Sequence, residues 1–307
     1  MIRIGTRGSQ LALAQAGAVA VHLTGAGEQV EIVPVRTEGD RRQEVQLAAI
    51  GGKGLFVREI EEMLLSGGID CAVHSLKDLP AQLPPGLVFA AFPEREDARD
   101  VLVTREPARF ESLSPGARVG TGSPRRRALA LALRPDLVVE PVRGNVDTRL
   151  RKLASEGWDG VLLAASGLKR LGLVPGNVQS LDPEVFVPAV GQGVLAVEIR
   201  ADDHRVRARL EPLDHAPTRA CALAEREFLG RLGASCNSPM AAHAVLEGGR
   251  LRMNGLVASE DGRKVLRASG LGTPDEPQRL GRQLAESLLD QGAASVAALR
   301  PVASWRE

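Results

Sequence analysis

Three kinds of residue in this sequence could act together chemically: a carboxylate after an apolar strand, arginines at predicted helix starts, and a cysteine in a loop. The carboxylate is Asp78, near the end of the segment His74 to Pro80. Open α/β sheets bind ligands at strand ends. Among arginines, Asp78 could stay ionised and stabilise a developing positive charge. The alternative is that Lys77 and Asp78 form a solvated ion pair that closes the strand.

Arginines occur at or near the first turn of three predicted helices. These turns are Arg7 to Ser9, Thr121 to Arg127 and Arg143 to Arg149. Free backbone N–H groups at a helix start attract anions, whereas each cation there opposes the helix dipole by roughly 0.3–1 kcal/mol. Three such turns favour a ligand with several acidic groups. An exposed basic surface is the alternative.

The basic residues are unusually rich in arginine. Only five of the 39 are lysines, which leaves 34 arginines against a net charge of +1. Coding bias is one explanation, and repeated capture of carboxylates or phosphates by guanidinium groups is the other. Aromatic residues make up 3%, tyrosine is absent and no basic run exceeds three residues. We therefore expect no nucleic-acid partner.

The three cysteines differ in their surroundings. Cys71 lies in an apolar strand, Cys221 lies on a helix among alanines and leucines, and Cys236 lies in a loop after that helix. Their odd number and wide spacing argue against a disulfide framework and a structural zinc, and we expect no metal. Cys236 is expected to be accessible, either as an incidental thiol or as the attachment point of a covalent group.

The pattern of apolar residues predicts an α/β protein with a different C-terminal part. The 307 residues favour about two domains, with three possible. Strands and helices alternate over residues 2–76 and 118–200, which predicts largely parallel sheets. Beyond residue 214, a helix at 218–232, three strand candidates and a helix at 278–290 predict a small α+β domain with an antiparallel sheet.

Two glycine-rich turns and the start of the sequence argue against a nucleotide-binding loop, a membrane span and a signal peptide. Residues 51–56 lack the spacing of a nucleotide P-loop, and Val190 to Gly193 is too short for a dinucleotide fingerprint, so a hinge or substrate-contact turn fits better. No apolar stretch approaches the roughly 18 residues that span a bilayer, and residues 1–5 begin like a strand and not like a signal peptide. We expect a cytoplasmic protein with no membrane partner.

Eight segments, in order, resemble the hydroxymethylbilane synthase (porphobilinogen deaminase) family. They are Thr6 to Ser9, Gly51 to Phe56, His74 to Pro80, Thr121 to Arg126, Arg143 to Asn145, Gly167 to Gly172, Val190 to Gly193 and the loop around Cys236. The resemblance implies two α/β domains like those of periplasmic binding proteins plus a small C-terminal α+β domain. The implied boundaries are 1–94 with 192–213 for domain 1, 95–191 for domain 2, and 214–307 for the domain that carries Cys236.

The resemblance also implies an activity and a set of site residues. The family is a transferase of tetrapyrrole (heme) biosynthesis: it adds four porphobilinogen molecules, with loss of ammonia, to a dipyrromethane cofactor, then releases linear hydroxymethylbilane by hydrolysis. Cys236 would hold the cofactor through a thioether, Asp78 would be the catalytic acid, and the protein would be a monomer. The implied cofactor-binding residues are Lys77, Thr121, Ser123, Arg125, Arg126, Arg143 and Gly144. The implied substrate-binding residues are Arg7, Ser9, Phe56, Arg149, Arg170 and Gln192.

One other function fits the same residues. A non-catalytic, two-lobed anion-binding protein on this fold would use the arginine turns and would need neither Asp78 nor Cys236. The missing export signal argues against a transport version of that protein.

Overall fold

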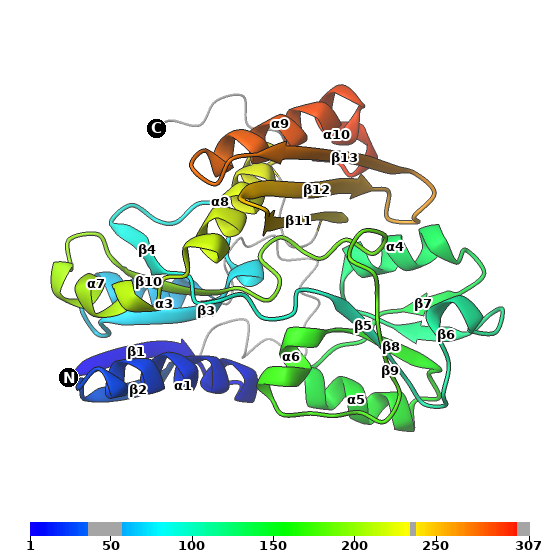
Figure 1. The fold of residues 1–307 in the computed structure, drawn as a ribbon. Coiled ribbons are helices and arrows are strands. Elements are labelled where there is room, and N and C mark those ends of the chain that lie inside the picture. The colour runs from blue at the N-terminus through cyan, green and yellow to red at the C-terminus, as the bar shows by residue number, and fades with distance from the viewer. Residues whose placement is uncertain (36–56, 234–237, 300–307) are drawn as a thin grey trace. The chain divides into compact units, whose positions relative to one another are not determined.

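The computed structural model describes residues 1–35, 57–233 and 238–299, which form two compact units (Figure 1). Unit 1 comprises residues 1–96 and 194–219, and unit 2 comprises residues 97–193 and 220–307. The chain therefore leaves the first unit, builds part of the second, and returns once. The finer division into three domains stays a prediction.

Unit 1 is built on a five-stranded mixed sheet in the order β2-β1-β3-β10-β4. The strands are β1 (Ile2–Arg7), β2 (Val30–Val35), β3 (Cys71–Ser75), β4 (Leu87–Ala91) and β10 (Leu195–Arg200). β1 runs parallel to β2 and β3, whereas β10 runs antiparallel to both of its neighbours. The carboxyl ends of β1 and β3 consequently lie at the same edge of the sheet.

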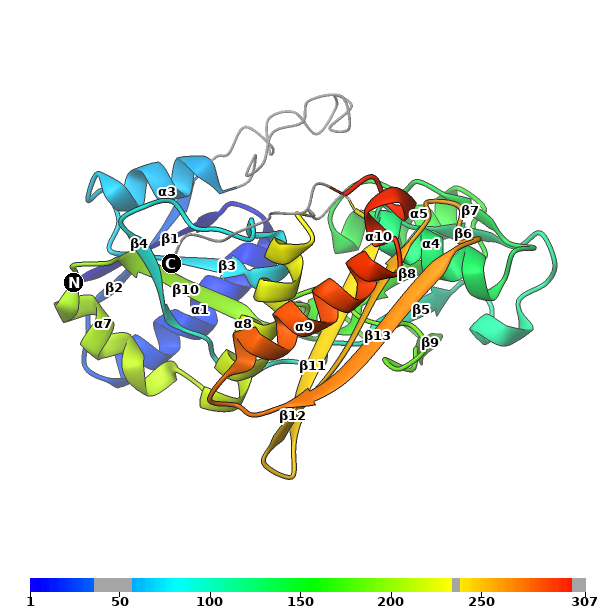
Figure 2. The ribbon, with the colours of Figure 1, turned by 90° about the horizontal axis from the view of Figure 1, so that it is seen from above.

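Helices cover both faces of this sheet (Figure 2). α1 (Gln10–Gly25) and α7 (His204–Leu210) belong to a core with Cys71 and Val73, while α3 (Arg58–Leu65) belongs to a second core with Ala72. Because successive residues of a strand point to opposite faces, these two cores lie on opposite sides of β3. The apolar spacing of Ala16, Val19 and Leu23 gives α1 its buried stripe.

Unit 2 contains a second five-stranded sheet with the order β7-β6-β8-β5-β9. The strands are β5 (Asp100–Thr104), β6 (Arg118–Gly120), β7 (Val138–Glu140), β8 (Gly160–Ala164) and β9 (Val178–Ser180). β6 is parallel to β7 and β8, and β5 is antiparallel to β8 and β9. Both sheets thus place one antiparallel strand fourth in the order, which confirms the expectation of two α/β domains of one type.

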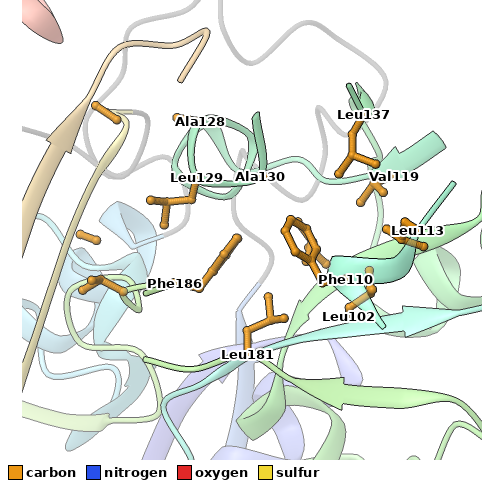
Figure 3. Packing of buried hydrophobic residues seen from close by; sticks show 14 of the residues in the cluster. Leu102, Phe110, Leu113, Val119, Ala128, Leu129, Ala130, Leu137, Leu181 and Phe186 are labelled. Carbon is orange, nitrogen blue, oxygen red and sulfur yellow. The ribbon is translucent and has the colours of Figure 1, made fainter. Parts of the chain in front are cut away.

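Two helices of unit 2 begin at the arginine-bearing turns, 121–127 and 143–149, where the sequence predicts helix starts. They are α4 (Pro124–Leu133) and α5 (Val146–Ser155), followed by α6 (Ala165–Arg170), and short 3-10 turns occur in the two units as η2 (Leu76–Asp78), η3 (Phe110–Ser112) and η4 (Glu211–Leu213). α4 packs Ala128, Leu129 and Ala130 into an apolar cluster of this unit (Figure 3). In that cluster Phe110 and Phe186 meet edge to face, with ring centroids 6.2 Å apart.

The C-terminal part of unit 2 is the predicted α+β arrangement. It contains α8 (Ala216–Arg231), which begins in unit 1, the antiparallel strands β11 (Met240–Glu247), β12 (Arg250–Ala258) and β13 (Val265–Gly272), and then α9 (Pro277–Asp290) and α10 (Ala293–Val296). α9 lies along the sheet (Figure 2), where Gly270 lets Leu284 approach closely. Gly255 of β12 does the same for Phe228 of α8. The two predicted helices at 218–232 and 278–290 are thereby confirmed.

Candidate functional site

Unit 1 has a pocket at the carboxyl ends of β1 and β3. Its lining includes Arg7, Ser9, Gln15, His74 and Asp78. The pocket exists because two parallel strands end together and the helix after each strand starts there, which is the usual ligand site of an open α/β sheet. The sequence prediction that Arg7, Ser9 and Asp78 belong to one site is in keeping with this placement.

Asp78 is presented by a single 3-10 turn that is held from both sides. Leu76 is buried and donates its N–H to the carbonyl of Val194 at 3.0 Å, and Leu79 is also buried and bonds back to Leu76 at 3.1 Å. Between these two buried leucines Asp78 is exposed and Lys77 is half-buried. The turn therefore holds the Asp78 carboxylate in the pocket wall while solvent and ligands can reach it.

Ser9 has a structural task as well as a place in the pocket. It is the N-cap of α1, and its hydroxyl accepts a hydrogen bond from the N–H of Ala12 at 3.3 Å. The 16-residue α1 has no acidic residue in its first turn, so its positive end is not offset by the helix itself. The start of α1, with Arg7 before it, is thus suited to an acidic group of a ligand.

Sequence reasoning missed Gln15, which is buried in the wall of this pocket. Its side-chain amide donates to the hydroxyl of Ser75 at 2.8 Å, and its carbonyl oxygen accepts from the same hydroxyl at 3.2 Å. The Ser75 hydroxyl thus accepts from the amide nitrogen of Gln15 and donates to its carbonyl oxygen. The signal in the sequence was a polar residue at an apolar position of α1, between Ala12 and Ala16.

In unit 2, Arg125 and Arg126 converge on one buried carboxylate, Asp100. Arg125 donates to Asp100 at 2.6 and 3.2 Å, and Arg126 donates through Nε at 2.8 Å. The exposed fractions are 4%, 5% and 0% for Arg125, Arg126 and Asp100. Burial alone would raise the pKa of Asp100, but the two guanidinium charges hold it well below its usual range. Two positive charges face one negative charge, so the cluster carries a surplus positive charge.

Gln192, which the family resemblance implies as a substrate-binding residue, also contacts this cluster. Its amide donates to the carbonyl of Ala98 at 2.7 Å and to Asp100 at 2.9 Å, and its carbonyl oxygen lies 3.4 Å from Arg126. The neighbouring Gly191 and Gly193 have φ of +69° and +86°, a region that glycine adopts without strain. Sequence reasoning missed Asp100, because nothing nearby in the sequence marks its partners.

The turns before α4 and α5 lie next to each other at the edge of the second sheet. The backbone N–H of Thr121 donates to the backbone carbonyl of Glu140 at 2.9 Å. A Cβ at Gly122 would lie 2.7 Å from the backbone carbonyl oxygen of Val142. Ser123 caps α4, and its hydroxyl accepts from the N–H of Arg126 at 3.4 Å. The structure therefore brings the predicted residues Thr121 and Ser123 close to the turn that contains Arg143 and Gly144.

The second of these turns depends on a glycine. Gly144 has φ +111°, and a Cβ there would lie 2.6 Å from Thr148. Arg149 donates through Nε to the carbonyl of Gly144 at 2.9 Å, while Arg143 is exposed. At the end of α6, Arg170 donates to the carbonyl of Gly193 at 2.7 Å. Arg170 is thereby tied to the turn that holds Gln192.

Two predicted site residues, Phe56 and Cys236, lie outside the described residues. Cys71 and Cys221 are described, and both are buried and form no disulfide within the described residues. Burial raises the pKa of Cys71 to about 12, so this thiol is a poor nucleophile at neutral pH. Within the ranges that the structure describes, no group of three His, Cys, Asp or Glu side chains could hold a metal ion. No described helix is long and apolar enough to cross a bilayer.

The strand order and the arginine-bearing helix starts define an α/β protein with two sheets of one topology and sites suited to acidic groups. Comparisons with known proteins show which family within this class the chain matches. The family model described as "Porphobilinogen deaminase, dipyromethane cofactor binding domain" matches residues 2–208, and "Porphobilinogen deaminase, C-terminal domain" matches residues 219–290. The chain belongs to the porphobilinogen deaminase family.

Curated relatives match over nearly the whole chain. A porphobilinogen deaminase of Syntrophobacter fumaroxidans is 47% identical over 298 residues, which cover 96% of each chain. One from Syntrophus aciditrophicus is 48% identical, over 95% of this chain and 96% of its own. Among solved structures, a periplasmic substrate-binding protein from Coxiella burnetii is similar with 16% identity and a TM-score of 0.42, covering 74% of this chain and 96% of its own.

Proposed function

We propose that Asp78 and the arginine-bearing helix starts carry out the activity of this porphobilinogen deaminase. The enzyme is a transferase, a hydroxymethylbilane synthase, that joins four porphobilinogen molecules on a dipyrromethane cofactor and releases the linear tetrapyrrole. The observation that carries the proposal is the pocket that holds Asp78 together with Arg7 and Ser9. A non-catalytic anion-binding protein is not favoured, because the chain belongs to an enzyme family along nearly its whole length.

Asp78 would act at the carbon that loses ammonia. Departure of ammonia from porphobilinogen leaves a positive charge on the pyrrole and its methylene carbon. An ionised carboxylate in the pocket wall stabilises that charge, and the stabilisation grows as bound substrate displaces water. The rigid turn between Leu76 and Leu79 keeps the carboxylate at one place for each of the four additions.

The residues of unit 2 have the chemistry to hold the cofactor. Dipyrromethane carries acetate and propionate side chains, and it supplies the pyrrole carbon to which the first substrate is joined. The surplus positive charge of Arg125 and Arg126 over Asp100 suits one carboxylate, and the start of α4 adds free N–H groups. We assign Lys77, Thr121, Ser123, Arg125, Arg126, Arg143 and Gly144 to cofactor binding, with Cys236 as the covalent attachment.

A second set of residues, three of them arginines, would hold the substrate and its carboxylates. We assign Arg7, Ser9, Phe56, Arg149, Arg170 and Gln192 to substrate binding. Each charge-assisted hydrogen bond contributes about 1.5–3 kcal/mol, so loss of one arginine can stall a particular addition. We further propose a cytoplasmic monomer that binds no nucleic acid and has three domains, with boundaries at 1–94 plus 192–213, 95–191 and 214–307.

Intact-mass measurement tests the covalent attachment. The purified protein should be heavier than its sequence by two pyrrole units, and Cys236→Ser should lose that increment. A mass equal to the bare sequence would refute the attachment.

Turnover measurements test Asp78. Asp78→Ala should retain the mass increment and lose turnover by about 10²–10⁴-fold, the usual contribution of a positioned acid or base. Asp202→Asn, at an exposed position of unit 1, is the control and should behave as the parent does. Near-normal product formation by Asp78→Ala would remove Asp78 from the mechanism.

A further inference from the structure

Behind the Asp78 pocket lies a buried group of three titratable side chains, which we call the acid cluster: Glu61, His74 and Glu198. They come from three elements, α3, β3 and β10. Their exposed fractions are 9% for Glu61, 7% for His74 and 0% for Glu198. None of the three has a role in the site described above, although His74 lines the pocket of Asp78.

The acid cluster is short of positive charge. Nε2 of His74 lies 3.2 Å from Oε2 of Glu198. The contact is not aligned as a hydrogen bond, and neither oxygen of Glu198 has a hydrogen-bond partner within the described part of the chain. The same holds for Oε1 of Glu61. Two buried carboxyl groups thus share a single imidazole as their possible counter-charge.

The other charged groups on the elements around the acid cluster have partners of their own. They are Arg200 of β10 with Asp203, Arg58 with Glu62 on α3, Arg3 of β1 with Asp70, and Glu59 of α3. On the pocket side the charged groups are Arg7 and Asp78. Within the described residues, no lysine or arginine forms an ion pair with Glu61 or Glu198.

These surroundings require the acid cluster to keep protons. An unpaired carboxylate away from water is costly, so a buried carboxyl group takes up a proton instead. Even a charged imidazole offsets only one of two ionised carboxylates, so the acid cluster is neutral only if one carboxyl group keeps its proton. Burial, and then the charge of Glu198, raise the pKa of Glu61 to about 7, against the opposing effect of His74. One proton can therefore be exchanged near neutral pH.

We propose that Glu61, Glu198 and His74 form a proton store that serves the Asp78 pocket in every condensation. The inference rests on the proposed role of Asp78. In each cycle the C–N bond of protonated porphobilinogen breaks and its electron pair leaves with ammonia. The store then gives one proton to the ammonia, which departs as ammonium.

The second half of the cycle refills the store. A C–C bond forms between the methylene carbon and the α-carbon of the acceptor pyrrole, and the C–H bond at that α-carbon breaks with its electron pair returning to the ring. The released proton passes through the pocket to His74 and so to the two carboxyl groups. One proton is given and one is taken, so the cycle balances without a further reactant. His74, Glu198 and Glu61 act through the pocket and are positioning residues.

The pH dependence of turnover tests the store. Glu61→Gln keeps the shape of the neutral carboxyl group and removes its proton exchange. In the holoenzyme we expect kcat at pH 7 to fall about tenfold, below the range for a directly acting group, with KM unchanged and the break near pH 7 lost from the kcat profile. Glu62→Gln, exposed on the same helix, is the matched control and should keep the parent profile. A Glu61→Gln profile that superimposes on that of the parent overturns the proposal.

Infrared spectroscopy tests the proton store without relying on enzyme turnover. Infrared difference spectra of the holoenzyme between pH 5.5 and 8.5 should show a protonated carboxyl band that titrates near pH 7 and is absent from Glu61→Gln. Absence of such a band in the parent overturns the proposal, as does an equal loss of kcat at all pH values in Glu61→Gln and in a second variant, Glu198→Gln. Normal turnover of Asp78→Ala would refute the proposed role of Asp78 and, with it, the proton store. If Asp78→Ala is inactive while Glu61→Gln has the parent's activity and pH profile, only the proton store is refuted.

Discussion

Removal of the Asp100 charge should destabilise unit 2 strongly. In Asp100→Asn the shape of the side chain is kept, but Arg125 and Arg126 lose the only carboxylate they bind in the described structure. Breaking a buried ion pair on one side costs about 3–5 kcal/mol, because the remaining charge stays buried without compensation. Here two guanidinium groups remain, each about 5% exposed or less, so the upper part of that range is expected.

The size of this effect can be measured by scanning calorimetry at pH 7. For 150–250 residues, 1 kcal/mol corresponds to roughly 2–4 °C, so a cost of about 4–5 kcal/mol should lower the unfolding temperature by about 8–20 °C. The control is Asp97→Asn, three residues before Asp100, which breaks a solvent-accessible pair with Arg99 and should cost about 0–1 kcal/mol. The low pKa of Asp100 adds a pH test: its stabilisation is present at neutral pH and is lost as pH falls through the folded pKa. A change below about 1 kcal/mol in Asp100→Asn would refute the reasoning.

Three smaller perturbations follow from the same structure. Gly144→Ala places a Cβ against Thr148 at positive φ and should cost about 1–3 kcal/mol in urea unfolding, whereas Gly116→Ala, at positive φ but in open space, should cost less. Equal losses would show that the contact with Thr148 is unimportant. Ser9→Ala removes the cap of α1 and should lower stability by about 1 kcal/mol while raising KM; an unchanged KM would exclude Ser9 from substrate binding. Because the folded pKa of Glu61 is raised, the folded state holds this proton more tightly, so stability should fall as pH rises from about 4.5 to about 7, by about 2 kcal/mol after allowance for solvent screening. In Glu61→Gln, stability measured by thermal unfolding should not fall over this pH range. If stability falls with pH as steeply in the variant as in the parent, another group is responsible.

Local signals predicted most of the helices that position the site. Ser9 precedes α1, and Ser123 with Pro124 opens α4, as cap preferences require. The hairpin turns of the C-terminal sheet were also readable, because Gly248 and Gly249 adopt positive φ between β11 and β12. These features depend on a few neighbouring residues, so one sequence is enough to find them.

The buried polar contacts were not predicted, because they join residues far apart in the chain. Asp100 meets Arg125 at a separation of 25 residues and Gln192 at 92. These residues lie in different segments of the fold, so the periodicity of a single helix or strand cannot reveal their contacts. Glu198 gave a weaker signal, a carboxylate between the apolar residues Val197 and Ile199 of β10, and its neighbours in the acid cluster lie on two other elements. The strand order was not predicted, since apolar periodicity does not say which strands pair.

The place of β10 has a consequence for synthesis of the chain. The sheet of unit 1 is complete only when residues 195–200 lie between β3 and β4. A ribosome makes the whole of residues 97–193 before those six residues emerge. Until then β3 and β4 each lack a hydrogen-bonding neighbour, and open strand edges pair readily with other chains. Nascent chains that stall before residue 195 should therefore be prone to aggregate and to be bound by chaperones.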